Sequence, residues 1–249
     1  MAQSSNFTAV ILGASGGIGS ALARRLHKRK GCLILAGRDR EKLGPLTREL
    51  GCEVAVCDPT QVDEVEGLLK KAAKDYGSVE AIANCVGTLL LKPVHLTTWE
   101  EWQETLRINL GSAFATVRSG VKVMSRTGGS IVLCSTAASL MGIANHEAIA
   151  AAKGGINGLV LSAAATYASK GIRVNAVAPG MTRTPLTERL TSNEALRKGS
   201  EAMHALGRIG EPDEVAAALE FFMAPENNWV TGQILAVDGG LSSLAPRRT

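Results

Sequence analysis

Short apolar runs alternate with longer segments of helical periodicity along the chain. Each run is rich in aliphatic residues and is bounded by glycine or polar residues, as expected for strands buried on both faces. The pattern predicts strands at residues 8–12, 32–36, 53–56, 81–84, 130–134, 172–176 and 233–237. It predicts helices near residues 17–29, 40–50, 61–75, 98–125, 147–168 and 212–223. Strands that alternate with helices indicate an α/β fold, a doubly wound parallel sheet of about seven strands with helices on both faces.

The chain contains no internal repeat and no linker, so we expect a single domain over residues 1–249. One long irregular stretch, rich in proline and threonine, covers residues 179–204. A structureless segment of this length inside a compact domain is usually a lid or a binding loop. We therefore expect a substrate-binding loop or lid at residues 184–205.

Composition narrows the classes of function. The formal net charge is only +4, and basic and acidic residues alternate, as in residues 38–42. Because no basic stripe with spaced aromatic residues is present, the sequence does not support nucleic-acid binding. The five cysteines lack CxxC spacing, which predicts reduced thiols, a cytoplasmic location and no metal site. We find neither a signal-peptide pattern nor an apolar run near the ~20 residues that span a bilayer, so we expect no membrane association.

A glycine-rich turn follows the first predicted strand and leads into the first predicted helix. Glycines there permit a tight turn and close approach of backbone N–H groups to a pyrophosphate, and the helix N-terminus favours negative charge. Glycine also makes ordinary tight turns, but the position between strand and helix indicates dinucleotide binding. The predicted cofactor contacts in this turn are Gly13, Ser15, Gly16, Gly17, Ile18 and Gly19.

The end of the second predicted strand indicates which dinucleotide is bound. A carboxylate there would bind a ribose 2′-hydroxyl, whereas an arginine suits a 2′-phosphate. Arg38 stands at this place, which favours NADP(H) over NAD(H). In the alternative interpretation, Arg38 is a solvated surface residue and Asp39 binds the ribose.

With these motifs placed, the chain resembles the short-chain dehydrogenase/reductase family over nearly its whole length, which implies a Rossmann-type fold. Beyond the glycine-rich turn, the matching segments are Cys-Asp-Pro at 57–59, Asn-Cys-Val-Gly at 84–87, Arg-Ile-Asn-Leu at 107–110, and residues 171–180, 207–212 and 237–240. The resemblance implies that Asp58 contacts adenine, that Asn109 is the active-site asparagine, and that Thr184 bonds the nicotinamide carboxamide. The further cofactor contacts that it implies are Asn84, Gly87, Lys153, Pro179, Gly180 and Thr182.

The chain departs from the family at the residue that donates a proton. Lys153 matches the family's lysine, which binds the nicotinamide ribose, but Ile149 stands four residues before it, where the family has a tyrosine. The family's serine lies thirteen residues before that tyrosine, a count that falls on Thr136. Thr136 can still donate a hydrogen bond, and Ser135 or Ser139 could do so in another register; Thr136 as a plain turn residue is the alternative.

His146 and Glu147 are the candidate replacements for the tyrosine. If the helix already covers residue 146, then His146, Ile149 and Lys153 lie roughly on one face. A neutral imidazole is a poor acid but can polarise a carbonyl. In the alternative, His146 is an exposed loop residue and Glu147 simply complements the helix dipole. Two tyrosines occur elsewhere, and we expect both to be structural: Tyr76 and Tyr167.

These observations predict an NADP(H)-dependent oxidoreductase with an altered proton donor, acting on a small, largely apolar carbonyl, alcohol or activated double bond. The candidate catalytic residues are Asn109, Thr136, His146 and Lys153. The candidate pocket wall, which could equally be plain core, is Leu89, Leu90, Leu91, Leu140, Met141, Met181 and Leu186. Two other functions stay open: a catalytically silent NADP(H)-binding sensor or scaffold, and a non-redox isomerase or cyclase.

The resemblance also implies self-association. The helices near 98–125 and 147–168 match those that pair between subunits in the family, so we expect a homodimer or homotetramer. Gly154, Gly155 and Gly158 would permit close helix approach, although they could equally serve packing within one subunit.

Overall fold

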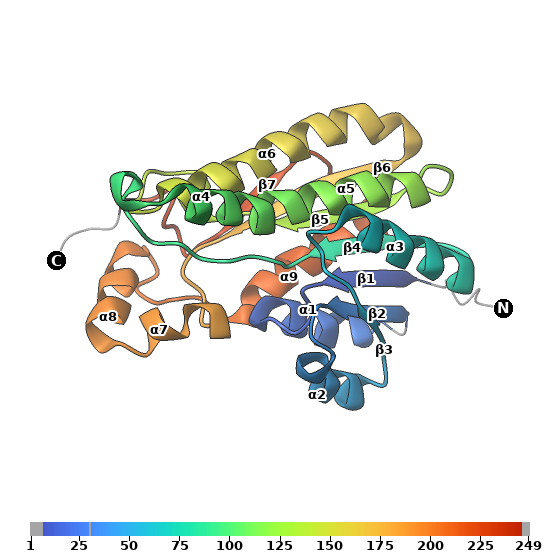
Figure 1. Cartoon of the computed structure of the whole chain (residues 1–249), viewed down its shortest axis with the longest axis horizontal. Coiled ribbons are helices and arrows are strands. Elements are labelled where there is room, and N and C mark those ends of the chain that lie inside the picture. Colours follow the sequence, from blue (N-terminus) through green and yellow to red (C-terminus); the bar gives the residue numbers. More distant parts are fainter. Residues whose placement is uncertain (1–6, 30, 246–249) are drawn as a thin grey trace.

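A parallel sheet of seven strands forms the centre of the computed structural model, which describes residues 7–29 and 31–245 (Figure 1). The strands are β1 (Thr8–Leu12), β2 (Cys32–Gly37), β3 (Glu53–Val56), β4 (Ala81–Asn84), β5 (Gly129–Cys134), β6 (Ile172–Pro179) and β7 (Ile234–Val237). Their order is β3-β2-β1-β4-β5-β6-β7, and every neighbouring pair is parallel. The predicted doubly wound α/β fold is confirmed.

Helices cover both faces of the sheet, as Figure 1 shows. The helices α3 (Val62–Tyr76), α5 (Ser112–Val123) and α6 (Glu147–Tyr167) share one apolar cluster with one face of the strands. The helices α1 (Gly17–His27), α2 (Arg40–Leu50) and α9 (Pro212–Met223) share a second cluster with the opposite face. The central strands are apolar on both faces because each face is covered, which is the pattern from which they were predicted.

An ion-pair cluster joins α1 to α9 at the surface. Arg25 lies 2.9 Å from Asp213 and 2.7 Å from Glu220, and Arg29 lies 2.8 Å from Glu220 and 2.9 Å from Glu226. We call these five residues the α1–α9 ion cluster. Glu220 is its centre, since it accepts from both arginines and its side chain is only 16% exposed.

The predicted helix near 98–125 is divided into three parts. The helix α4 (Trp99–Leu106) begins at a capping box in which the Thr98 hydroxyl accepts from the Glu101 N–H and the Glu101 carboxylate accepts from the Thr98 N–H. A π-helical turn (Arg107–Gly111) follows and leads into α5. Such turns insert an extra residue into a helix and are frequent at functional sites. Apolar periodicity alone does not reveal this insertion.

The expectation of an irregular stretch at 179–204 was wrong. The segment contains a short α7 (Glu188–Thr191) and α8 (Glu194–Met203), which lie together at one end of the molecule in Figure 1. The Asn193 side chain caps α8 by accepting from the Leu196 N–H at 3.1 Å. Two i,i+4 ion pairs then support the helix, Glu194–Lys198 at 2.8 Å and Arg197–Glu201 at 2.6 Å.

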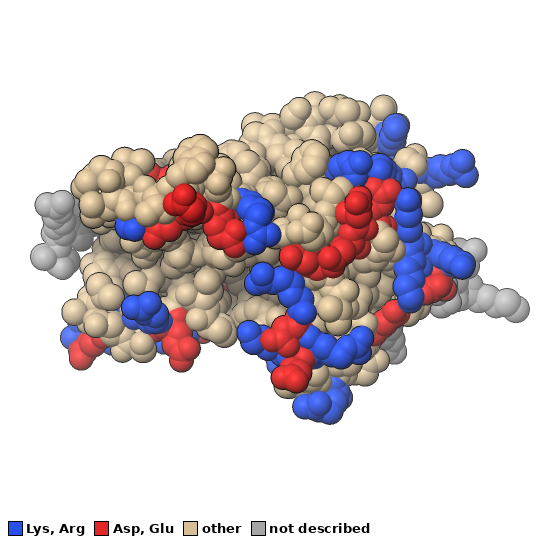
Figure 2. Space-filling view, in the orientation of Figure 1, with Lys and Arg blue, Asp and Glu red and all other residues tan. Residues whose placement is uncertain are grey.

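Two surface properties bear on partners. Figure 2 shows acidic and basic side chains interleaved on the viewed face, with broad uncharged regions between them. By length and composition alone, the helical segment Glu147–Lys170 is apolar enough to cross a membrane. Its helix α6 covers the central strands, which accounts for much of that apolar character.

Candidate active site

The carboxyl ends of the strands border a cavity of about 300 Å³. The strand order reverses at β1, which pairs with β2 on one side and β4 on the other. In doubly wound sheets, ligands bind outside the carboxyl ends of the strands at such a reversal. The predicted site residues in the cavity wall are Gly16, Gly17, Ile18, Gly87, Thr136, His146, Lys153, Pro179, Gly180 and Thr184. Within the described part of the chain, those outside the wall are Gly13, Ser15, Gly19, Arg38, Asp58, Asn84, Asn109 and Thr182.

The glycine-rich turn is built so tightly that side chains would not fit. Gly13 has a φ of +77°, and a Cβ on Gly17 would lie 2.8 Å from the Thr184 methyl carbon. A Cβ on Gly19 would collide with the Gly13 carbonyl oxygen. Among the described residues, no side chain caps α1, whose N-cap is Gly16. The first N–H groups of α1 therefore lie open to an anion at the cavity wall, as a bound pyrophosphate requires.

Arg38 and Asp39, the two candidates for the ribose, have different environments. Arg38 is exposed and follows directly after β2. Asp39 is the N-cap of α2, and its carboxylate accepts from the Glu41 N–H at 2.9 Å and the Lys42 N–H at 3.2 Å. The Asp39 carboxylate is thus already engaged by the helix that it caps.

Asp58 lies close enough to Arg38 for their charges to interact. Its carboxylate accepts from the Thr60 backbone N–H at 3.0 Å and the Thr60 hydroxyl at 2.9 Å. Burial alone would raise the pKa of Asp58, but these hydrogen bonds and the charges of Arg38 and Arg107 hold the pKa below its usual value. An ionised carboxylate and an exposed guanidinium therefore lie together beyond the end of β2.

Lys153 is a buried cation at the sheet edge. It is 6% exposed, and its Nζ donates to the Cys134 carbonyl oxygen at 2.8 Å. Burial lowers the pKa of Lys153, an effect that the nearby Cys134 and Cys85 thiols oppose. A Cβ on Gly87 would lie 3.4 Å from Nζ, so the glycine keeps the backbone close to the amine. An ammonium has three N–H donors, which leaves two for a ligand.

The hydroxyl groups that follow β5 differ in the hydrogen bonds that they already make within the protein. Ser135 Oγ lies 2.6 Å from Asn157 Oδ1 and 3.0 Å from Ser139 Oγ. Ser139 Oγ also donates to the Thr136 carbonyl oxygen at 2.6 Å. Thr136 Oγ1 has only a long contact of 3.4 Å, as acceptor from the Ala138 N–H, among the described residues. Of the three hydroxyls considered from the sequence, that of Thr136 is therefore the one available to a ligand in the cavity.

His146 lies at the N-terminus of α6, in the same cavity wall as Ile149 and Lys153. The helix begins at Glu147, so His146 is the N-cap residue and not, as the one-face argument assumed, part of the helix. Its Nδ1 lies 2.8 Å from the Ala144 carbonyl oxygen, and the side chain is half-buried. Glu147 is exposed and is outside the cavity wall. The geometry therefore favours His146 over Glu147 as the protic group at this place.

Two asparagines shape the site from behind. Asn109, in the π-helical turn, is 1% exposed; its amide donates to the Thr105 carbonyl at 2.9 Å and the Thr88 hydroxyl at 3.0 Å. Asn84 donates to Thr116 Oγ1 at 2.9 Å and accepts from the Val86 N–H at 2.9 Å. Both side chains are hydrogen-bonded within the protein, where they help to position neighbouring segments. The roles that the resemblance implies for them stay predictions.

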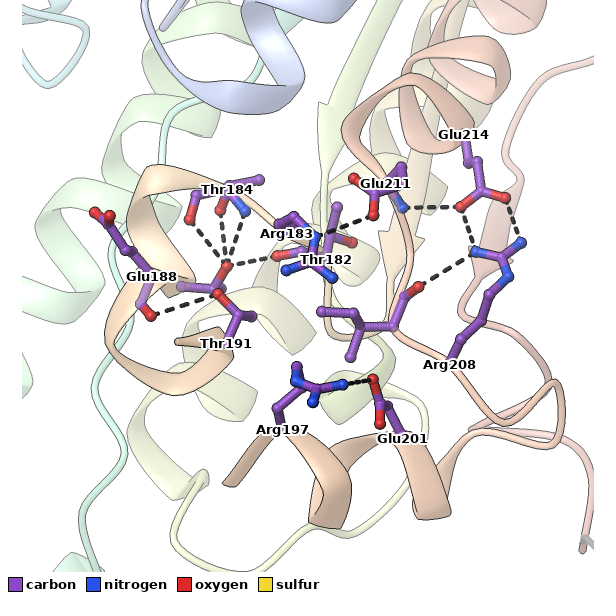
Figure 3. Close-up of polar contacts among 12 residues, drawn as sticks. Thr182, Arg183, Thr184, Glu188, Thr191, Arg197, Glu201, Arg208, Glu211 and Glu214 are labelled. Atoms are coloured by element: carbon purple, nitrogen blue, oxygen red, sulfur yellow. Dashed lines mark hydrogen bonds and ion pairs between the residues drawn. The ribbon is translucent and has the colours of Figure 1, made fainter. Parts of the chain in front are cut away.

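The segment that enters α7 and α8 is tied to the start of α9 (Figure 3). Backbone bonds join Arg183 N to the Gly210 carbonyl at 2.9 Å and Gly210 N to the Met181 carbonyl at 2.8 Å. Arg183 lies 3.1 Å from Glu211. Figure 3 also shows the Thr184 hydroxyl among the polar contacts that hold this segment, where it lies 3.1 Å from the Thr187 hydroxyl. Thr184 thereby lies between the fixed base of the segment and the glycine-rich turn.

The apolar wall differs from the predicted one. Three of the predicted residues line the cavity: Leu89, Met181 and Leu186. Four do not: Leu90, Leu91, Leu140 and Met141. The wall instead includes residues that sequence reasoning missed: Ile143, Ser200, Met203, His204 and Leu241. The i,i+3 spacing of Ser200 and Met203 places both on one face of α8, and this spacing is the signal that the sequence offered.

The tyrosines that the chain contains lie elsewhere. The Tyr76 hydroxyl donates to Glu53 at the far end of α3, and the Tyr167 ring faces the Lys170 ammonium at the end of α6. Neither residue lines the cavity, within the described chain.

The chain matches the family model described as Enoyl-(Acyl carrier protein) reductase over residues 13–242. It therefore belongs to that family, within the short-chain dehydrogenases/reductases, and is an oxidoreductase. It is 35% identical over 242 residues to cis-4-hydroxycyclohexanecarboxylate dehydrogenase from Sinomonas cyclohexanicum, covering 95% of this chain and 96% of that protein. It is 33% identical over 239 residues to the 3-oxoacyl-[acyl-carrier-protein] reductase FabG from Thermotoga maritima, covering 93% and 96%.

Solved structures share the fold. ElxO with NADP bound is 25% identical, with a TM-score of 0.90 over 96% of this chain and 100% of that chain. A tyrosine-to-phenylalanine variant of ElxO with NADPH bound is 26% identical, with a TM-score of 0.90 over the same shares.

Proposed function

We propose that the protein is an NADP(H)-dependent oxidoreductase of a small, largely apolar carbonyl or alcohol, with Ile149 in place of the family's tyrosine. One observation carries the proposal: a single cavity joins the uncapped start of α1, the Lys153 ammonium, the Thr136 hydroxyl and the His146 imidazole. When bound, the nicotinamide would supply or accept hydride. The protein must then move one proton at the substrate oxygen.

The choice of NADP(H) rests on Arg38. Because Asp39 is engaged as a helix cap, Arg38 is the residue left to meet a 2′-substituent, and a guanidinium suits a phosphate. ElxO was solved with NADP and NADPH, and removal of one tyrosine hydroxyl from that protein is compatible with bound NADPH. We therefore expect cofactor binding here without a tyrosine at 149.

His146 is proposed to move the proton. A carbonyl oxygen only accepts, so Nδ1 carries the proton that bonds to Ala144, and the neutral ring keeps Nε2 as an acceptor. In alcohol oxidation Nε2 takes the hydroxyl proton, directly or through Thr136. In carbonyl reduction the ring first takes up a proton from solvent at Nε2, and the imidazolium then donates it to the oxygen, while the Lys153 ammonium stabilises negative charge nearby.

The substrate class follows from the cavity wall. Leucine, isoleucine and methionine side chains predominate away from Lys153, which suits an alicyclic or short aliphatic carbonyl. The name of the Sinomonas relative, a dehydrogenase of a cyclohexane hydroxy acid, supports a cyclic ketone as the first probe. Residues 184–205, with α7 and α8, are proposed as the lid of a single-domain enzyme.

Association is proposed through the exposed face of α6. A Cβ on Gly154 or Gly158 would meet no described atom within 4 Å, whereas one on Gly155 would lie 2.8 Å from the Leu110 side chain. Gly155 thus serves packing within the chain, and the other two lie on an open face. An apolar hollow beside it is lined by Phe114 and neighbouring leucines. We propose a homodimer or homotetramer in the cytoplasm, where the five free cysteines stay reduced. The variant Gly158→Glu should shift the protein toward monomer, as measured by sedimentation.

The function is tested by the loss of NADPH absorbance with a panel of cyclic ketones. We expect turnover in the wild type and a fall of ~10²-fold or more in His146→Ala, the range of a positioned general acid. His95→Ala is the matched control, because His95 is exposed and outside the cavity wall. Normal turnover in His146→Ala would remove His146 from the mechanism, and no turnover on any ketone or alcohol would contradict the proposed reaction.

A further inference from the structure

The imidazole of His204 is buried at the end of α8, where three segments meet, and the proposed reaction gives it no role. It is 4% exposed. A Cβ on Gly180, at the end of β6, would lie 2.6 Å from Nε2, and one on Gly239, after β7, would lie 3.6 Å from ring carbon Cδ2. Gly180 therefore leaves space that the ring fills, while Gly239 packs against the ring at ordinary contact distance. The ring also forms part of the wall of the site cavity.

Both ring nitrogens have a backbone partner. Nδ1 lies 2.6 Å from the Ser200 carbonyl oxygen, and Nε2 lies 3.1 Å from the Met181 nitrogen. A carbonyl oxygen only accepts and a backbone N–H only donates. His204 must therefore carry its proton on Nδ1 and accept at Nε2, and only this neutral form satisfies both partners.

We propose that neutral His204 is a positioning residue that bridges α8 to the backbone after β6 and so sets the width of the substrate end of the cavity. The proposal rests on the proposed function, because both segments that it joins line that cavity. Ser200 and Met203 line it from α8, and Gly180 and Met181 line it from the end of β6. Loss of the bridge would let α8 move away from the substrate without removing any group that transfers a proton.

A proton on Nε2 would break the bridge. It would turn the acceptor into a donor that faces the Met181 N–H, so the cationic ring cannot hold both partners. The charged groups that share cavity walls with His204, and those on α8, are Asp238, Arg208, Glu214, Lys153, His146, Glu194, Arg197, Lys198 and Glu201. His204 also borders a second cavity, and the charged groups that line it are already engaged. Asp238 accepts from the Ser242 and Gly240 N–H groups, and Arg208 pairs with Glu214 at 2.6 Å.

The test is hydrogen exchange of the Met181 amide and the α8 amides in the wild type, His204→Leu and His204→Gln. In His204→Leu, we expect the Met181 amide to exchange roughly tenfold faster, the factor that corresponds to a lost hydrogen bond. The side-chain carbonyl of His204→Gln can still accept from Met181 but cannot be protonated. We expect this variant to keep most of the protection of the Met181 amide.

Steady-state kinetics provide a second test of the bridge. The substrate KM should rise roughly tenfold in His204→Leu, with a much smaller change in kcat, and His204→Gln should restore it at neutral pH. Equal exchange in His204→Leu and the wild type would overturn the proposal, as would exchange of the Met181 amide in His204→Gln as fast as in His204→Leu. If exchange changes as expected while even the wild type turns over no substrate, the bridge is supported and the proposed reaction fails.

Discussion

Replacing Ile149 with tyrosine should add a second proton donor to the cavity, beside His146. Ile149 is 3% exposed and lies in the cavity wall one helical turn before Lys153, whose buried ammonium would favour ionisation of a phenol. Thr136 lies in the same wall. The remaining groups of the site are thus already arranged around the position of the new hydroxyl.

The size of the effect can be bounded from the structure. A positioned general acid contributes ~10²–10⁴ in rate. The larger ring opposes this by overpacking a buried position, at a cost of ~1–3 kcal/mol in the free energy of unfolding. The adjoining cavity of about 300 Å³ should keep that cost at the low end, since the ring can extend into it. Ile149→Phe carries nearly the same ring without the hydroxyl, so the ratio of the two variants isolates the proton donor.

The assay is NADPH consumption with cyclic ketones at saturating cofactor. We expect kcat in Ile149→Tyr to exceed that in Ile149→Phe by ~10²-fold or more. Circular dichroism and calorimetric NADPH binding check that both variants fold and bind cofactor. Equal kcat values in two folded, cofactor-binding variants would refute the idea that a phenol at position 149 is placed to donate a proton.

Other predictions concern the glycine-rich turn, the choice between NADP(H) and NAD(H), and the stability of the fold. Arg38→Asp should weaken NADPH binding by roughly 10- to 100-fold, the loss of a charge-assisted hydrogen bond, and should favour NADH; unchanged NADPH affinity by calorimetry would exclude this role. Gly19→Ala should abolish cofactor binding because its Cβ meets a backbone carbonyl, whereas the control Gly67→Ala, which has open space in α3, should bind normally and gain ~0.5–1 kcal/mol in urea unfolding. Burial would raise the pKa of Glu220, but the arginines of the α1–α9 ion cluster outweigh it and lower that pKa. Its stabilising contribution is therefore present above the ordinary value of 4.5 and is lost as pH falls through the lower folded-state pKa. Glu220→Gln should cost ~1 kcal/mol in urea unfolding at pH 7 and less in acid; a pH-independent difference would contradict the sign.

Most of the fold could be predicted from the sequence because strands buried on both faces carry an unambiguous apolar signal. The strands β1, β3 and β4 have the predicted bounds, and β6 runs on from 176 to Pro179 toward the cavity. What failed was local. A capped helix within a proline- and threonine-rich stretch was predicted as a loop, since its only large apolar side chains are Leu196 and Met203.

The candidate site was predictable where chemistry depends on backbone shape and not where it depends on side-chain direction. The family resemblance pointed to Thr136 and Lys153, and both line the cavity; His146 lines it too, although the spacing argument for it assumed a helical residue. Spacing could not show that Ser135 turns toward Asn157, because both serine and threonine suit the turn. Nor could it reveal His204, whose partners are backbone groups of segments distant in sequence.

The contact between Gly17 and Thr184 has a thermodynamic consequence. A Cβ on Gly17 would lie 2.8 Å from the Thr184 methyl carbon, so the glycine-rich turn packs tightly against the start of the proposed lid. A nucleotide bound at the turn would therefore also bias the proposed lid, and a substrate that drew this segment inward would act back on the turn. The two ligands should then alter each other's dissociation constant by one common factor, whichever is added first.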